Sequence, residues 1–262
     1  MTTLEAAAAT DAGCVRTHNE DAFLVGQQVW AVADGMGGQA AGEAASRIAM
    51  DCVRQADRSG PIDQAGIADL VARINQRILD FGARHPDAVG LGTTLAGVGL
   101  MTLAGQAHWL VFNVGDSRVY RLTGGVLHQE TTDHSEVQGL VDDGHITAEA
   151  ARTHPRRNVL VRALGSPEPP RADIRLIPYL AGDTVLVCSD GLSTEVADVT
   201  IEEILLTTPD PREAVDALVA AARANGGRDN ITAIVIGVGG AREEAECTVE
   251  DTLPIQVVGE EQ

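Results

Sequence analysis

Carboxylates beside glycine or asparagine, at or near the ends of apolar runs, are the residues of this sequence that suggest chemistry. The acidic sites are Asn19-Glu20-Asp21, Asp34-Gly35, Gly115-Asp116-Ser117, Asp190-Gly191 and Asp229-Asn230. The ends of strands can converge on one cleft, where desolvated carboxylates repel one another strongly. Each acid therefore either caps its own turn or joins the others in holding cations.

A single Asp-Gly pair is most often a turn, because the Asp side chain accepts backbone hydrogen bonds there and Gly adopts the positive φ angles that many turns need. The joint occurrence of all these sites favours a metal centre. Oxygen ligands alone suit Mg²⁺ or Mn²⁺ better than zinc or copper. The seven histidines lack H-x-x-x-H spacing, and each is expected to be solvated or a structural hydrogen bonder.

Composition excludes several other kinds of chemistry. The 262 residues carry a formal net charge of −19, which disfavours binding to nucleic acid or to anionic lipid. The nineteen basic residues are all arginine. Without lysine, neither Schiff-base catalysis nor a phosphate-loop or kinase lysine is available.

Cysteine usage and hydropathy indicate a cytoplasmic protein. The four cysteines contain no C-x-x-C pair, as expected in a reducing compartment. The N-terminus has no basic segment preceding an apolar one, and no run of about 18 apolar residues occurs. We therefore expect neither a signal peptide nor a membrane span.

The elements that must position the acids are helices and short strands in groups. Apolar spacing predicts helices over 45–53, 67–81 and 215–222. Strands are expected at 29–32, 93–101, 108–114, 118–122, 126–128, 174–178, 184–188 and 231–238. Several strands are apolar on both faces, which predicts packed sheets with helices outside. From 241 onward the sequence is acidic and aperiodic, so residues 1–240 form the expected catalytic domain and 241–262 a flexible tail.

Short motifs around these acids occur in a characteristic order. They are T-D-x-G-x-V-R-x-x-N-E-D at 10–21, A-D-G-M-G-G-x-x-x-G-E at 33–43, G-T-T at 92–94, G-D-S-R-x-Y-R at 115–121, D-H-S at 133–135, R-A-L-G at 162–165, S-D-G-L at 189–192 and D-N-I-T at 229–232. Over residues 5–238 the chain resembles the metal-dependent protein phosphatases of the type 2C (PPM) family, particularly the compact bacterial Ser/Thr phosphatases. The resemblance implies an α+β fold, a four-layer α-β-β-α sandwich with two central antiparallel sheets flanked by helix pairs.

The resemblance also implies the roles of individual residues toward two Mn²⁺ or Mg²⁺ ions. Asp34 bridges the ions, the Gly35 carbonyl completes one shell, and Asp190 and Asp229 hold the first ion. Glu20 reaches the second ion and Asp21 orients the neighbouring shell. Asp116 is implied as a ligand of a third, weakly bound ion.

A water activated by the two ions attacks phosphorus in line, while Arg16 binds the phosphate oxygens. The alternative for Arg16 is an ion pair with Glu20 or Asp21. Met36 stands where many eukaryotic members have histidine, and Thr194 where some have a further aspartate. The segment 135–165 is expected to be a helical flap, and its arginines at 152, 156, 157 and 162 either steer phosphopeptides or are simply solvated.

The expected function is hydrolysis of phosphoserine and phosphothreonine in cytoplasmic signalling, with phosphoproteins and a cognate Ser/Thr kinase as partners. We expect a monomer. Two alternatives are a pseudophosphatase that binds phosphoproteins without turnover and a non-enzymatic metal-binding module. The four acids Glu20, Asp34, Asp190 and Asp229 argue against the first, and Arg16 with the glycine loops against the second.

Overall fold

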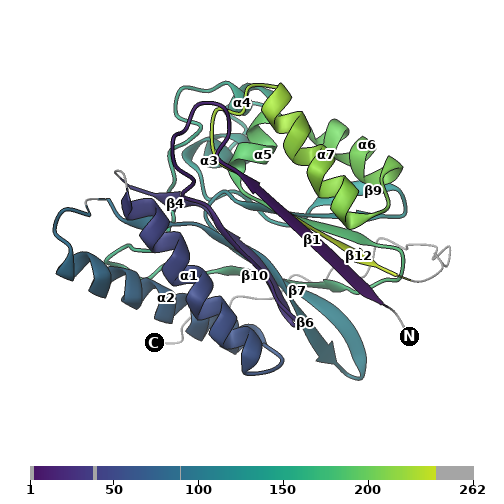
Figure 1. Ribbon diagram of the computed structural model, residues 1–262, viewed down its shortest axis with the longest axis horizontal. Helices are drawn as coiled ribbons and strands as arrows, with labels where there is room; N and C mark the ends of the chain where they lie inside the picture. The colour runs from purple at the N-terminus through teal and green to yellow at the C-terminus, as the bar shows by residue number, and fades with distance from the viewer. Residues whose placement is uncertain (1–2, 38–39, 89, 240–262) are drawn as a thin grey trace.

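Two sheets of five strands each form the centre of the molecule, and central strands such as Thr184–Cys188 and Ile231–Val238 are buried on both faces (Figure 1). The computed structural model describes residues 3–37, 40–88 and 90–239. In order across the first sheet lie β1 (Leu4–Asp11), β12 (Ile231–Val238), β11 (Thr184–Cys188), β8 (Arg118–Thr123) and β9 (Val126–Gln129). The second contains β10 (Asp173–Pro178), β7 (Gln106–Val114), β6 (Leu95–Leu103), β3 (Val29–Ala33) and β2 (Ala22–Val25). All the pairings in both sheets are antiparallel.

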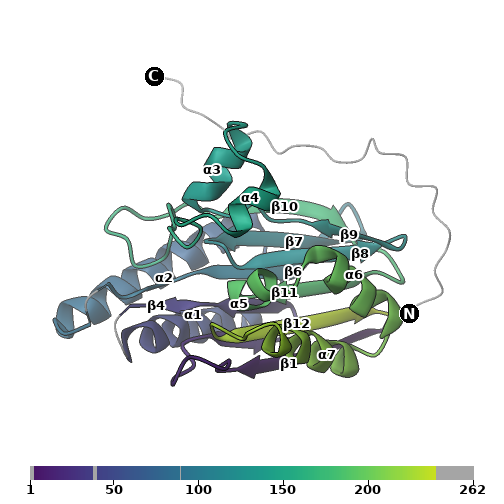
Figure 2. The same ribbon diagram turned by 90° about the horizontal axis from the view of Figure 1, so that it is seen from above.

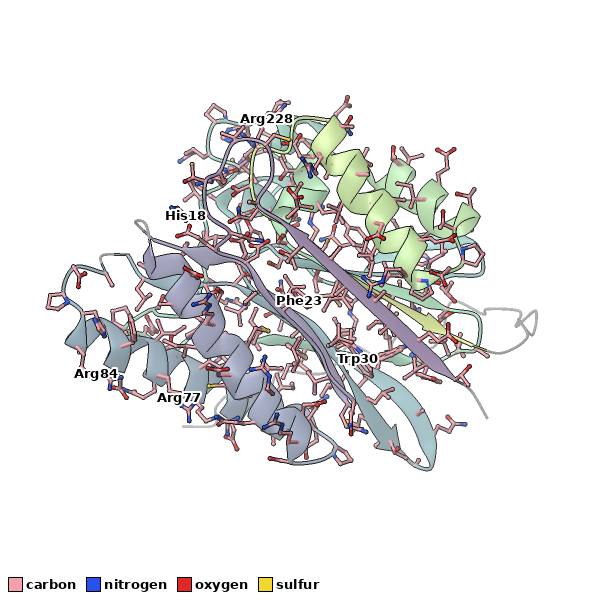
Figure 3. All side chains as sticks on the ribbon, in the orientation of Figure 1. His18, Phe23, Trp30, Arg77, Arg84 and Arg228 are labelled. Atoms are coloured by element: carbon pink, nitrogen blue, oxygen red, sulfur yellow. The ribbon has the colours of Figure 1, made fainter. Side chains whose placement is uncertain are left out.

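Helices cover the outer face of each sheet, so the predicted four-layer α-β-β-α sandwich is confirmed (Figure 2). The long helices α1 (Ala40–Arg58) and α2 (Gln64–Arg84) pack on the second sheet. The helices α5 (Asp190–Glu195), α6 (Asp198–Thr207) and α7 (Pro211–Ala224) cover the first sheet. A third apolar layer lies between the sheets, where Trp30 and Trp109 meet edge to face at 5.8 Å. Figure 3 shows Trp30 in the interior and Arg77 and Arg84 projecting from α2.

Most elements agree with the periodicity of the sequence. The three predicted helices lie within α1, α2 and α7, and each predicted strand matches an observed one to within a few residues. The prediction missed β1, whose sequence LEAAAATD is poor in β-branched residues. Pairing with β12 along eight residues forms this strand in spite of its low propensity. The short strand β2 and the helices α5 and α6 were also not predicted.

Strand register brings the ends of both sheets to one side of the sandwich. In the first sheet Asp11 pairs with Ile231, and Cys188 pairs with both Ala233 and Arg118. In the second sheet Ala22 pairs with Ala33, and Leu95 pairs with Val114. The chain segments that carry the predicted acids therefore leave the two sheets at the same end.

The predicted flap leaves the sandwich at this end. It contains two short helices, α3 (Glu136–Asp142) and α4 (Ala148–Arg152), each begun by a hydroxyl N-cap, Ser135 and Thr147. An antiparallel bridge between Ser135 and Leu160 joins the two ends of the flap. The predicted tail, 241–262, lies outside the described residues. Among the described helices, none combines the length and apolarity needed to span a bilayer.

Gly97 gives a test of the core between α1 and the second sheet. A Cβ at this position of β6 would lie 2.5 Å from the Phe112 ring and 2.5 Å from the Trp30 carbonyl oxygen, which cannot rotate away. We expect Gly97→Ala to lower stability by about 1–3 kcal/mol, as overpacked cores do. In Gly139→Ala, the added methyl in helix α3 meets nothing within 4 Å, so stability should rise slightly. Thermal unfolding of both variants tests the packing, and a Gly97→Ala protein as stable as wild type would contradict it.

Candidate metal centre

The predicted acids lie at the end of the sandwich where strands of both sheets end. Asp34 directly follows β3, Asp190 opens α5 two residues after the end of β11, and Asp229 lies two residues before β12. Each carboxylate interacts electrostatically with several others of the group, including Asp21 and Asp116. The structure thus brings together the side chains that the sequence distributes over more than 200 positions.

Hydroxyl groups hold the backbone of Asp34. The Asp34 amide donates to Thr94 Oγ1 at 2.9 Å, and the Thr93 hydroxyl donates to the Asp34 carbonyl at 2.8 Å. The Thr94 hydroxyl also shares a 2.7 Å hydrogen bond with Ser117 Oγ, directly after Asp116. The two threonines therefore tie the loop of Asp34 to the loop of Asp116.

Glycine at position 35 allows the first turn of α1 to approach the Glu20 loop. A Cβ on Gly35 would lie 2.2 Å from the Gly42 carbonyl oxygen and 2.6 Å from that of Glu20. The Glu20 amide donates to Asn230 Oδ1 at 2.8 Å, and Asn230 Nδ2 donates to the carbonyls of Ala12 and His18. Asn230 thereby fastens the segment that carries Arg16 and Glu20 beside Asp229.

Asp21 lies deeper than Glu20. Its Oδ2 accepts a hydrogen bond from Ser189 Oγ at 2.8 Å. Its Oδ1 is buried and has no hydrogen-bond partner. A buried oxygen without a partner is costly unless a bound species completes its coordination.

Burial and mutual repulsion shift the acids toward their neutral forms. Desolvation, reinforced by neighbouring carboxylates, raises the pKa of Asp21 to about 7. Desolvation and the charge of Asp229 raise the pKa of Asp190 to about 6, although a hydrogen bond with Asp34 opposes the shift. The pKa of Asp34 and that of Asp116 are raised well above the usual value for the same two causes, with desolvation the larger. Burial also raises the pKa of Glu20.

These residues fit a hard divalent cation. All the side-chain donors are carboxylate oxygens, the orphaned Asp21 Oδ1 lacks a partner, and the raised pKa values report a site short of positive charge. Within the described ranges, no three His, Cys, Asp or Glu side chains already form a closed ligand group. The acids thus lie in one region of the molecule, but their side chains do not converge on a single point.

Arg16 is a cation in direct contact with this group. Its Nη2 donates to Asp229 Oδ2 at 2.7 Å, and about half of its side chain is exposed. This partner differs from both ion-pair partners expected from the sequence, Glu20 and Asp21. Asp229 raises the pKa of Arg16 through this hydrogen bond and its charge.

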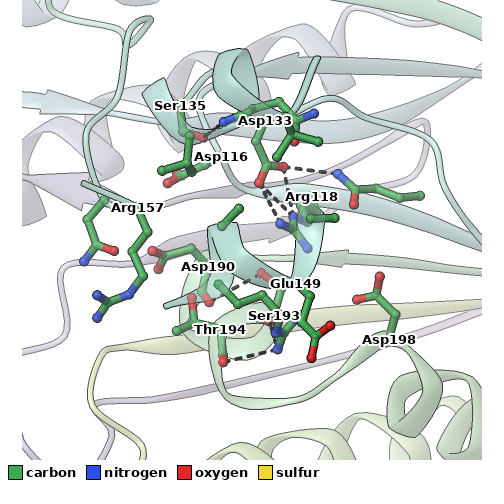
Figure 4. Close-up of a pocket in the computed structure, with 18 residues that line it drawn as sticks. Asp116, Arg118, Asp133, Ser135, Glu149, Arg157, Asp190, Ser193, Thr194 and Asp198 are labelled. Atoms are coloured by element: carbon green, nitrogen blue, oxygen red, sulfur yellow. Dashed lines mark hydrogen bonds and ion pairs between the residues drawn. The ribbon is translucent and has the colours of Figure 1, made fainter. Parts of the chain in front are cut away.

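A cavity of about 280 Å³ separates the acids from the flap (Figure 4). Asp116 and Asp190 line it from the sandwich, and Arg157 lines it from the flap. On its floor Arg118 binds Asp133 through three hydrogen bonds of 2.6–3.1 Å. This buried ion pair leaves Arg118 committed to the protein.

The flap arginines have separate uses. Arg152 donates to the carbonyls of Ser193 and Thr194 in α5, Arg156 pairs with Glu136, and Arg162 pairs with Asp173. Within the described part of the chain, Arg157 is the one of the four whose side chain has no hydrogen-bonding or ionic partner. Glu195, beside Thr194, accepts from the Arg228 amide and does not line this cavity.

Sequence reasoning included Thr94 and Asn230 in motifs but assigned them no role. Their partners, Asp34 and Glu20, are 60 and 210 positions away, so no local pattern reveals the contacts. His134 was expected to be either solvated or a structural hydrogen bonder, and the second holds: it is buried, and its ring accepts from the Gly115 amide.

Comparison with known proteins agrees with this geometry. The family model described as "Protein phosphatase 2C" matches residues 15–235. The serine/threonine phosphatase stp of Listeria monocytogenes is 36% identical over 238 residues, covering 87% of this chain and 93% of that protein. PstP of Mycobacterium tuberculosis is 41% identical over 243 residues, which are 90% of this chain but 45% of that protein.

A solved structure carries the same arrangement of elements. The catalytic domain of the phosphatase PstP in complex with two manganese ions superimposes with a TM-score of 0.81. It is 38% identical, and the match covers 92% of this chain and all of that domain. The chain belongs to the protein phosphatase 2C family.

Proposed function

We propose that this chain is a metal-dependent protein phosphatase that hydrolyses phosphoserine and phosphothreonine with a water activated by two Mn²⁺ or Mg²⁺ ions. The observation that carries this conclusion is the group of mutually repelling, partly desolvated carboxylates at one end of the sandwich. The names of the Listeria and Mycobacterium relatives, and the two manganese ions in the PstP structure, support it.

The carboxylates divide the work of holding the ions. Asp190 and Asp229 would hold the first ion, Glu20 with the Gly35 carbonyl would hold the second, and Asp34 would be shared by both. Asp21 would orient the neighbouring ligands, and Asp116 would hold a third, weaker ion. The ions, when bound, supply the positive charge that makes a water nucleophilic near neutral pH.

Arg16 is the side chain of this protein that binds the phosphate. A guanidinium offers two parallel N–H groups, which match two oxygens of a phosphate. The half-exposed Arg16 side chain lies at the edge of the acidic group, where it is accessible to a substrate. When phosphate binds, the Arg16 guanidinium moves from the Asp229 carboxylate to the phosphate, and so exchanges one anionic partner for another.

The remaining assignments are proposals of the same kind. The substrates are phosphorylated Ser/Thr proteins, among them a cognate Ser/Thr kinase, and the protein acts as a cytoplasmic monomer. Residues 1–240 form the catalytic domain and 241–262 an acidic tail. The large exposed apolar side chains of the described residues are spread over several elements, which supports the monomer.

Removal of metal tests the function. Hydrolysis of p-nitrophenyl phosphate and of a phosphothreonine peptide should require Mn²⁺ or Mg²⁺ and stop in excess EDTA, because every proposed ligand is oxygen. Asp34→Asn, which preserves size, should be inactive with metal present. A pseudophosphatase would bind the peptide without turnover, and a structural module would do neither. Full turnover in EDTA would rule out the mechanism.

The acids also predict how the stability of the metal-free protein depends on pH. In the unfolded chain they titrate near pH 4, whereas Asp190 and Asp21 titrate near 6 and 7 when folded. Between these values the folded state binds more protons, so stability falls as pH rises from about 4 to 7.

We therefore expect the melting temperature without metal to fall between pH 5 and pH 7.5. Saturating Mg²⁺ should raise it more at pH 7.5 than at pH 5, where protons compete for the carboxylates. Asp190→Asn should flatten the metal-free profile, because it removes one repelling charge. A metal-free melting temperature that rises over this interval would contradict the electrostatic argument.

Arg16→Ala should raise KM for a phosphothreonine peptide while changing kcat less, because Arg16 binds the phosphate and the carboxylates are untouched. The expected loss is about 1.5–3 kcal/mol, the range for a hydrogen bond to a charged group. Arg16→Lys keeps the charge but loses the paired N–H groups, and should recover only part of this loss. An unchanged KM in steady-state kinetics would reduce Arg16 to the ion pair with Asp229.

A further inference from the structure

The turn that carries Asp116 begins at Gly115, which has no side chain to anchor it. Gly115 has φ of +111°, and a Cβ there would lie 2.6 Å from Thr94 Cγ2. This residue must therefore be glycine, and the start of the turn is held by backbone groups, while Ser117 Oγ holds the other side of Asp116 through Thr94.

His134 binds both backbone groups of Gly115. The Gly115 amide donates to His134 Nδ1 at 3.0 Å, and the His134 amide donates to the Gly115 carbonyl at 2.9 Å. Asn113 Nδ2 adds a second donor to that carbonyl at 3.0 Å. The Gly115 carbonyl shares a rigid peptide plane with the Asp116 nitrogen, so fixing the carbonyl orients the start of Asp116.

The contacts of the ring determine its tautomer. Because Nδ1 accepts from an amide, a neutral ring must carry its proton on Nε2. Nε2 lies 3.1 Å from Asp173 Oδ2, a suitable acceptor. The hydrogen bond to His134, with help from Arg162, lowers the pKa of Asp173 to about 2, which keeps it an acceptor at neutral pH.

Arg162 completes the arrangement without competing for the ring. Its Nη1 lies 3.0 Å from His134 Nε2, but both atoms are donors, and Nη1 donates to Asp173 Oδ1 at 2.6 Å and to the Arg171 carbonyl at 3.1 Å. Asp173 thus accepts from both and holds them side by side. The chain of contacts runs from Asp173 on β10 through the imidazole to the turn before Asp116.

We propose that His134 is a positioning residue that orients Asp116 by binding Gly115 through a neutral imidazole whose tautomer the Gly115 amide and Asp173 set together. This inference rests on the proposed function, because it concerns the role of Asp116 in phosphate ester hydrolysis. His134 also accepts the Val161 amide through its carbonyl, which places it at the root of the flap. Its ring contacts Gly115, Asp173 and Arg162 and is not among the residues that line the cavity beside Asp116.

Kinetics give the first test. His134→Leu removes the acceptor, and we expect kcat for a phosphothreonine peptide to fall about 10- to 100-fold, as for the loss of a partner that orients a ligand, with KM changed less than about threefold. The loss should be smaller for p-nitrophenyl phosphate, whose leaving group needs little protonation, and Asp116→Ala should show the same pattern. His134→Asn, which can still accept from Gly115, should recover most of the activity. His128→Asn, an exposed strand substitution, is the matched control and should behave as wild type.

Nuclear magnetic resonance tests the inference without turnover and without metal. In full-length protein, ¹⁵N shifts of His134 should show a protonated Nε2 and an unprotonated, hydrogen-bonded Nδ1. The Gly115 amide should exchange slowly in wild type and in His134→Asn, and faster in His134→Leu. If His134→Leu does not fold, Asp173→Leu serves instead. This variant removes the acceptor of the Nε2 proton, so the His134 imidazole should lose the fixed tautomer.

The results separate this inference from the proposed function. An Nδ1-protonated ring, or a folded His134→Leu protein with wild-type kcat for the peptide, would overturn it. A wild-type protein that hydrolyses neither substrate with Mn²⁺ would overturn the proposed function, while the tautomer measurement would still decide whether His134 holds the turn.

Discussion

Repulsion between carboxylates at one end of the sandwich is the constraint on which the rest of the structure depends. Asp34 and Asp190 come from different sheets, yet they lie within hydrogen-bond reach of each other. Each desolvated charge raises the proton affinity of the others, so the group works against the folded state at neutral pH. The frame must hold these residues close together in spite of that tendency.

The frame does so mainly with hydrogen bonds to loop backbones. Thr93 and Thr94 hold Asp34, Asn230 holds the Glu20 loop, and His134 holds the turn before Asp116. Most of these partners are buried, where a hydrogen bond lost on one side leaves a polar atom unsatisfied. The apolar layers fix the strands, and these polar contacts then fix the chain beyond the strand ends.

The sequence predicts the layers better than it predicts these contacts. Apolar runs such as 184–188 are local signals, and the covering helices follow from their periodicity. Strand β1 has no such signal, because its alanines form a strand only through pairing with β12. In α6 a large part of the surface of Val199 and Leu206 is exposed while Ile201 and Leu205 are buried, so no clean apolar stripe marks the helix.

The same distinction applies to the site. The positions of the acids could be predicted because each stands beside an apolar run and a glycine or asparagine. The partner of Arg16 could not, since Asp229 is 213 residues away and competes with two nearer acids. Long-range pairing of this kind depends on how the sheets stack, which no window of sequence contains.

The bridge between Ser135 and Leu160 has a consequence for how this architecture can diversify. The flap leaves and re-enters the sandwich at neighbouring points, so the fold already holds the two ends of this loop together. Lengthening such a loop costs only about 0.6 kcal/mol per doubling of its length, because the entropy of closure grows logarithmically. Evolution can therefore exchange the surface above the acids, residue by residue or as a whole segment, while the chemistry beneath it stays constant.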